Sequence, residues 1–142
     1  MKRIEQLQNL SREHHQSLSL AQKAIKTHEA QNAETIEALC QTIVQDYPLT
    51  WMKHFQVEEE TIFALFSESK TSEVSQLCQL LEQEHRQMDV YYEQMKNADY
   101  TVLGDFGILL KKHTRMEERQ LFPLLEDVMT EEQLQSVFSA SS

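Results

Sequence analysis

The sequence predicts an all-α protein, an up-down-up-down four-helix bundle with a short additional helix near its C-terminal end. Glycine and proline are scarce, with two of each in 142 residues, and the abundant Glu, Gln, Leu and Ala favour helix. Apolar residues recur at the helical period in four long stretches. The connections between these stretches are short, which makes successive helices antiparallel neighbours. We interpret residues 1–142 as one domain, because the length is typical of one.

The first helix is expected to begin after Ser11, because serine is a favourable N-cap residue. One face of this helix carries His14, Leu18, Ala21 and Ile25. A short lead-in with Ile4, Leu7 and Leu10 precedes it. Residues 27–32 are predicted to form the first turn.

The second helical stretch runs from about residue 33 to residue 66 and contains Pro48. Proline lacks an N–H and collides with the preceding turn, so we expect the helix to kink or split there. Residues 67–72 are predicted to form a turn. The third helix, at about 73–96, turns Leu77, Leu81, Met88 and Tyr92 inward.

Residues 97–101 are predicted to form the third turn. The fourth helix should run from about residue 102 to residue 122, with an interruption near Pro123. The segment 130–138 has the pattern of a capping box and predicts a last short helix.

A thirteen-residue pattern occurs twice, as HFQVEEETIFALF from His54 and as HTRMEERQLFPLL from His113. In each copy a glutamate, Glu58 or Glu117, stands four positions after the histidine, so both side chains share one helical face. Flanking apolar residues place that face toward the core. Buried carboxylates and imidazoles are costly without partners, so the two pairs need a shared cation or a hydrogen-bonded network.

Each remaining helix supplies an inward histidine. His85 stands among the apolar residues of the third helix. In the first helix His14 and His15 are adjacent candidates. The neighbours of His14 at helical spacing are apolar and those of His15 are polar, so we favour His14, with His15 as the second choice.

Counted from the turns, the polar residues of the second, third and fourth helices meet at one level of the bundle. His54 lies roughly eight residues farther from the first turn than His14 does, so a longer connection or an irregularity near Pro48 must absorb the excess. Four histidines and two glutamates at one level suit iron, manganese or zinc. Two bridging glutamates and two histidines per ion would hold a dinuclear centre with open positions. We interpret the neighbouring Glu59, Glu60 and Glu118 as a solvated acidic face, with hydrogen bonding to the ligands or guidance of cations as the alternative.

The net charge of −10 argues against nucleic acid or an anionic membrane surface as a partner and suits a protein that handles cations. No stretch has the apolar length of a membrane span or the pattern of a signal peptide. Cys40 and Cys78 form no disulfide framework, so we expect reduced thiols and a cytoplasmic location. The sequence indicates no particular protein partner.

Four motifs then occur together and in order: LSREHHQSL (10–18), HFQVEEETIF (54–63), EHRQM (84–88) and HTRMEERQLFP (113–123). In these motifs the chain resembles the hemerythrin-like, HHE cation-binding family. The resemblance implies a four-helix bundle with an oxo- or hydroxo-bridged di-iron centre. It also implies that His14, His54, His85 and His113 are terminal ligands and that Glu58 and Glu117 bridge two Fe ions, with Zn or Mn possible in their place.

The resemblance also indicates a function. Oxygen-carrying hemerythrins have a fifth histidine one turn after the third-helix histidine, where this chain has Asp89, and an aspartate five positions after the last histidine, where Glu117 stands at four. We therefore expect binding of, or reaction with, O2, peroxide or NO in a redox, sensing or iron-handling role. Whether the protein turns over as an enzyme stays open. The alternatives are a metal-stabilised interaction module and a ferritin-like carboxylate oxidase, although such oxidases use Glu-x-x-His pairs.

Overall fold

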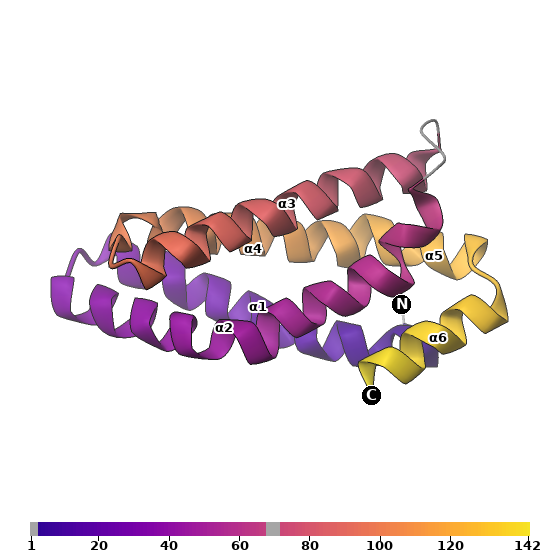
Figure 1. Cartoon of the computed structure of the whole chain (residues 1–142), viewed down its shortest axis with the longest axis horizontal. Helices are drawn as coiled ribbons and strands as arrows, with labels where there is room; N and C mark the ends of the chain where they lie inside the picture. Colours follow the sequence, from indigo (N-terminus) through magenta and orange to yellow (C-terminus); the bar gives the residue numbers. More distant parts are fainter. Residues whose placement is uncertain (1–2, 68–71) are drawn as a thin grey trace.

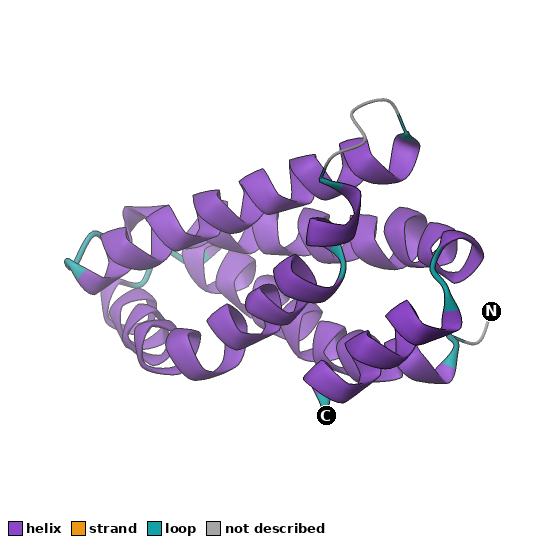
Figure 2. Ribbon diagram, turned by 45° about the vertical axis from the view of Figure 1, so that its right-hand side comes forward, coloured by secondary structure: helices purple, strands orange, loops and turns teal. Residues whose placement is uncertain are grey.

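The computed structural model describes residues 3–67 and 72–142, and these contain six α-helices and no strand. The helices are α1 (Glu5–Glu29), α2 (Ala33–Thr61), α3 (Glu73–Lys96), α4 (Leu103–Met116), α5 (Phe122–Val128) and α6 (Glu131–Ser141). Figure 1 shows α1 to α4 lying side by side with alternating direction, while α5 continues beyond α4 and α6 folds back at the same end. The same arrangement is helical throughout in the turned view of Figure 2. The predicted all-α, up-down-up-down bundle with a short C-terminal helix is confirmed.

The predicted start of the first helix at Ser11 is wrong. The helix begins at Glu5, because Leu7 and Leu10 continue the apolar face that also carries His14, and both leucines are fully buried. Ser11 lies inside α1, where its hydroxyl donates a hydrogen bond of 2.8 Å to Glu118. The apolar lead-in and the helix are therefore one element.

The connection between α1 and α2 has only residues 30–32, so the longer connection considered above is wrong. Asn32 caps α2 by accepting from the backbone N–H of Thr35 at 3.1 Å. The helix continues past Pro48 without ending, and Figure 1 shows it changing direction part-way along. Helix α2 is therefore kinked and not split, which is the ordinary consequence of an internal proline.

The second stretch leaves the α-helical conformation earlier than predicted. It ends at Thr61 and continues as the 3-10 helix η1 (Phe63–Phe66). The turn predicted at 67–72 falls largely on residues 68–71, which lie outside the described residues. Helix α3 has the predicted bounds, and Ser72 caps it by accepting from the N–H of Ser75.

The fourth stretch is interrupted as predicted, but the interruption lies before Pro123. After the 3-10 turn η2 (Tyr100–Val102) and helix α4, a π-helical turn η3 (Glu117–Leu121) leads into α5. Thr130 and Gln133 then form the predicted capping box at the start of α6.

The buried side chains form two apolar clusters on either side of a polar layer. The first includes Ile43, Tyr47, Trp51, Phe55, Met88, Tyr92, Phe106 and Leu110. The second includes Leu7, Leu10, Ile62, Phe63, Leu81, Phe122, Leu125 and Val137. Burial of each such side chain contributes about 1.5–3 kcal/mol. On every long helix the predicted site residues stand between the members of the two clusters, so apolar packing on both sides holds the polar layer in place.

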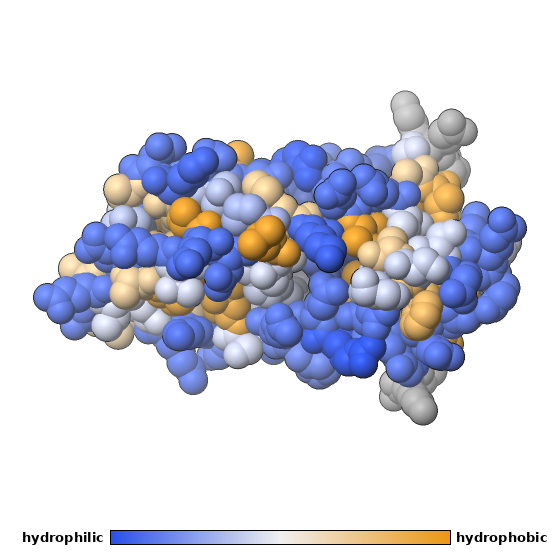
Figure 3. Space-filling view, turned by 60° about the horizontal axis from the view of Figure 1, so that its bottom comes forward, coloured by the Kyte–Doolittle hydropathy of each residue, from blue (hydrophilic) through white to orange (hydrophobic). Residues whose placement is uncertain are grey.

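The face drawn in Figure 3 is mostly hydrophilic, and its apolar groups form scattered patches. Among the described residues, none of the helices combines the length and apolar character needed to cross a membrane.

Candidate metal centre

The structure brings together six of the seven predicted site residues. His14 comes from α1, His54 and Glu58 from α2, His85 from α3, His113 from α4, and Glu117 from the start of η3. Their exposed fractions are 3% or less. His15 is not brought to this place: it is exposed and lies in a groove between α1 and α2.

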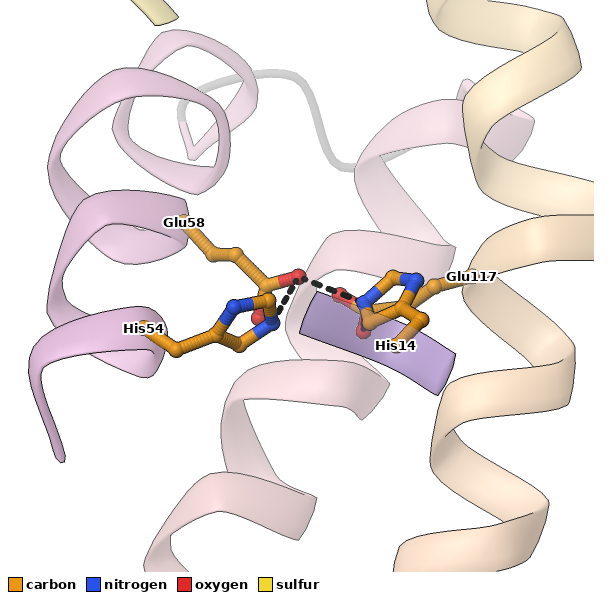
Figure 4. Close-up of side chains that lie close together, drawn as sticks. All are labelled: His14, His54, Glu58 and Glu117. Carbon is orange, nitrogen blue, oxygen red and sulfur yellow. Dashed lines mark ion pairs between the residues drawn. The ribbon is translucent and has the colours of Figure 1, made fainter. Parts of the chain in front are cut away.

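The first group, which we call the α1/α2 group, consists of His14, His54, Glu58 and Glu117. Figure 4 shows these side chains converging on one point. The His14 Nε2 atom lies 3.1 Å from Glu117 Oε1 and 3.6 Å from Glu58 Oε2. The His54 Nε2 atom lies 3.4 Å from the same Glu58 oxygen. Two imidazole nitrogens therefore face one oxygen of each carboxylate.

The second group, the α3/α4 group, consists of His85, His113, Glu58 and Glu117. The His85 Nε2 atom lies 3.1 Å from Glu58 Oε1, and the His113 Nε2 atom lies 3.3 Å from Glu117 Oε1. The two Nε2 atoms are themselves 3.1 Å apart. Two lone pairs at that distance repel each other unless a proton or another cation lies with them.

Both groups contain Glu58 and Glu117. In each group the potential ligand atoms lie within 4.8 Å of one another. A carboxylate has two oxygens and can contact two ions at once. The geometry therefore suits two neighbouring cations that share both glutamates, with two histidines completing each position.

Several buried polar atoms in these groups have no hydrogen-bond partner among the described residues. They are His14 Nε2, Glu58 Oε2, Glu117 Oε1 and Glu117 Oε2. An unsatisfied buried polar group costs about 1–3 kcal/mol, and more when it is charged. Four of them converging on one place fit a bound metal ion, because a metal would occupy the same lone pairs. The donor set of imidazole and carboxylate matches iron, manganese and zinc.

A second set of carboxylates accepts hydrogen bonds from the four histidines of the centre, at the ring nitrogen that faces away from it. Each Nδ1 atom donates to one glutamate: His14 to Glu118 at 2.7 Å, His54 to Glu13 at 2.8 Å, His85 to Glu59 at 2.9 Å, and His113 to Glu84 at 2.9 Å. With the proton on Nδ1, the Nε2 lone pair points into the centre, as metal binding requires. We call these four glutamates the supporting carboxylates.

The supporting carboxylates form a closed ring around the bundle. Each histidine is held by a glutamate from the helix that precedes it in the chain, and the histidine of α1 is held by Glu118 of η3, which follows α4. The ring ties all four helices together at the level of the centre. Such outer partners commonly contribute a factor of 10–100 to metal affinity.

Sequence reasoning missed part of this ring. Glu13 and Glu84 were not considered, and the solvated-face interpretation is wrong for Glu59 and Glu118, which are partly buried. It holds for Glu60, which is exposed and accepts from Gln56. Each supporting carboxylate stands next to a predicted site residue in the chain, and that adjacency was the available signal.

The π-helical turn explains how Glu117 and Glu118 serve different histidines. The N–H of Phe122 donates to the carbonyl of Glu117 rather than to that of Glu118. The freed carbonyl of Glu118 accepts from the Arg3 guanidinium at 2.8 Å. This wider turn directs Glu117 into the centre and leaves Glu118 against α1. Such π-helical turns are frequent at functional sites.

The centre is strongly charged without metal. Burial alone would lower the pKa of His54, but Glu58 and Glu13 outweigh it and raise that pKa to about 9. Burial is likewise outweighed at His113, where Glu117 and Glu84 raise the pKa to about 10. Burial would raise the pKa of Glu58, yet His54 and its neighbours hold it well below its usual value. The chain therefore stabilises both carboxylate and imidazolium here, and a metal ion must displace protons to bind.

Aromatic rings enclose the histidines. Phe55 stacks on His85 with a centroid distance of 4.1 Å, and Phe122 stacks on His14 at 5.3 Å. Such contacts fix the ring planes and keep water from the centre.

Asp89, the residue in the place of a fifth histidine, is not part of either group. The Tyr47 hydroxyl donates to it at 2.7 Å, and the Arg86 Nε atom lies 3.3 Å from its other oxygen. These two partners turn its carboxylate away from the centre.

A scan against protein families matches residues 4–125 to the Hemerythrin HHE cation binding domain. The chain belongs to this family. The match covers all six converging residues and the four supporting carboxylates of this HHE domain. No curated protein and no solved structure matches the chain. As an HHE cation-binding domain with two buried His and Glu groups, the protein is suited to metal binding.

Proposed function

We propose that this HHE domain is a non-haem di-iron protein that binds or reacts with O2, peroxide or NO in a redox, sensing or iron-handling role. One observation supports the proposal above all others: two His and Glu groups share Glu58 and Glu117. A single-ion site would not need two histidines on each side of a carboxylate pair. Iron suits the mixed nitrogen and oxygen donors, and manganese or zinc would also fit them.

Bound iron would supply one-electron redox chemistry and open positions for a small ligand. The chain supplies the rest. Glu58 and Glu117 provide shared negative charge at the centre. The four histidines offer Nε2 because each Nδ1 keeps its proton and donates it in a hydrogen bond to a supporting carboxylate. Phe55 and Phe122 limit access of water.

We further propose that the protein reacts with its ligand rather than carrying O2 reversibly. The resemblance placed a fifth histidine of oxygen carriers where Asp89 stands, and Asp89 is held by Tyr47 and Arg86. Each group thus has two histidines. The coordination positions that would stay open on the iron favour its oxidation by O2 over reversible O2 binding.

Metal content and optical spectra test the proposal. Protein purified without added metal from iron-rich medium should contain about two iron atoms per chain, as the two ligand groups require. It should absorb in the near ultraviolet, and the spectrum of the reduced protein should change on exposure to O2 or NO. One ion or none would overturn the di-iron assignment.

The same measurements separate the alternatives. Zinc without a response to O2 or NO would favour a metal-stabilised interaction module. Continued O2 consumption with an excess of Fe(II) would favour a carboxylate oxidase of the ferritin-like type.

A further inference from the structure

We propose that metal ions reach and leave the centre along one route, beside Glu13 and His54, with the Glu13 carboxylate as the first contact for a divalent cation. This inference rests on the proposed metal centre and adds where it is loaded. Four observations support it: the charge environment of the supporting carboxylates, their exposure, a cavity, and a pair of lysines.

Three of the four supporting carboxylates already have a cationic partner. Arg86 Nη2 lies 2.6 Å from Glu59, Arg3 Nη2 lies 3.6 Å from Glu118, and Lys112 Nζ lies 3.8 Å from Glu84. Within residues 3–67 and 72–142, Glu13 has no lysine or arginine partner. An arriving cation therefore finds uncompensated negative charge at Glu13 and competes with a fixed cation at the other three.

Glu13 is also the most exposed of the four supporting carboxylates. The Glu13 side chain is 37% exposed, against 28% for Glu118, 21% for Glu59 and 7% for Glu84. Glu13 also reaches directly to His54, whose own side chain is only 1% exposed. The Glu13 carboxylate is thus in contact both with solvent and with a buried histidine of the centre.

A cavity of about 240 Å³ lies at this place. Its walls include Glu13, His54 and Lys53, and residues 140–142 also line it. A second cavity, of about 280 Å³, lies beside Glu59 but has no histidine of the centre in its wall. The Glu13 cavity is large enough for a hydrated cation, and its inner wall is a ligand side chain.

On this route a cation would have to separate one hydrogen bond, between Glu13 and His54 Nδ1 at 2.8 Å, before it passed the His54 ring to the shared Glu58 oxygen, 3.4 Å from His54 Nε2. At the other three positions the ion would have to separate an ion pair as well as a histidine hydrogen bond. Uncompensated charge in a concave surface raises the association rate of cations by long-range attraction.

Two lysines provide a matched comparison. Lys53 and Lys112 each stand immediately before a histidine of the repeated pattern. Lys112 is paired with Glu84. Lys53 lines the Glu13 cavity and, in the part of the chain that the structure describes, forms no ion pair with a carboxylate. The positive charge of Lys53 therefore opposes the approach of a cation along the Glu13 route and not along the others.

Anaerobic stopped-flow mixing of the full-length metal-free protein with Co(II), followed by its visible absorption, tests the inference. We expect Glu13→Gln to slow loading by about tenfold, within the range of electrostatic effects on association. Lys53→Gln should accelerate loading by about twofold to fivefold. Glu60→Gln, at an exposed glutamate beside the second cavity, and Lys112→Gln are the matched controls and should leave the loading rate within about twofold of the wild type. Added salt should slow wild-type loading and affect Glu13→Gln less.

Two results would overturn the route. One is a loading rate reduced as much by Glu60→Gln as by Glu13→Gln. The other is faster release from Glu13→Gln with unchanged loading, which is the signature of a residue that only positions His54. Failure of the metal centre itself looks different, because the wild-type protein would then bind no Co(II) at all.

Discussion

The two ligand groups of the centre have the same composition and different surroundings. Both use two histidines, and both share Glu58 and Glu117. In the α3/α4 group the histidine Nε2 atoms lie 3.1 Å apart, and both supporting carboxylates are paired with a fixed cation. In the α1/α2 group one supporting carboxylate, Glu13, is half-open to solvent and has no such partner in the described residues.

The difference shows what the supporting residues control. In the proposed centre, identical ligand types would define where two ions bind, whereas the partners of the ligands would determine how firmly each position is held. We therefore expect the α3/α4 group to bind its ion more tightly and the α1/α2 group to exchange more readily. The predictions below test this comparison.

The largest effect is expected from the shared carboxylates. Glu58→Ala or Glu117→Ala should remove both metal ions, because each side chain belongs to both groups. Metal analysis after purification measures this, and Glu60→Ala, at an exposed glutamate two residues after Glu58, is the control. Loss of a single ion from either variant would show that the two positions are independent.

Removing one histidine should affect one position. His14→Ala should lose the ion of the α1/α2 group and keep the other, whereas His15→Ala should keep both, because His15 is exposed outside the groups. Metal content resolves the two outcomes. A His15→Ala variant with less metal than His14→Ala would contradict the assignment.

The sequence predicted which histidines and glutamates converge because its signals are local. The spacing of four between histidine and glutamate, and the apolar neighbours of His14, are helical periodicities that tertiary packing preserves. The partners of Nδ1 were not predictable in this way, because each supporting carboxylate comes from another helix. Their identity depends on helix rotation, and at Glu118 on a π-turn that no spacing rule indicates. The helix start predicted at Ser11 was wrong for a similar reason, because the Ser11 hydroxyl donates to Glu118 and does not cap a helix.

The stability of the metal-free protein should depend on pH, and the histidines of the two groups should lose their protons over different pH ranges. A raised histidine pKa stabilises the fold fully below pH 6.5, and this stabilisation is lost as pH rises through about 9 for His54 and about 10 for His113. We expect the Tm of the metal-free protein to fall between pH 6.5 and 10, with a loss on the order of a few kcal/mol. Nitrogen NMR should show His54 losing its proton before His113.

Metal-loaded protein provides the comparison for this titration. Metal binding requires deprotonated Nε2 atoms, so metal-dependent stabilisation should increase with pH over the same range. Deprotonation of His113 before His54, or a Tm independent of pH in the metal-free protein, would contradict the charge distribution described here.

A supporting carboxylate should have a smaller effect than a ligand. Glu84→Gln keeps an acceptor for His113 Nδ1 but removes the charge, and we expect the α3/α4 group to lose about 10–100-fold in affinity. Competition with a chelator measures it. Nitrogen NMR of the zinc-loaded protein should show the change at His113, on the next helix, and not at the adjacent His85. A change confined to His85 would contradict the ring.

The smallest effect is expected at Asp89, and it decides whether the α3/α4 group has a further ligand. Tyr47→Phe removes the buried hydroxyl that donates to Asp89, which should cost about 0.5–1.5 kcal/mol and lower Tm slightly. Asp89→Asn keeps an acceptor and should cost less. Both variants should retain both metal ions, since Arg86 and Glu59 stand between Asp89 and His85. Loss of one ion from Asp89→Asn would mean that this carboxylate turns inward on metal binding. The α3/α4 group would then have three ligands of its own, and the two groups would differ in composition as well as in surroundings.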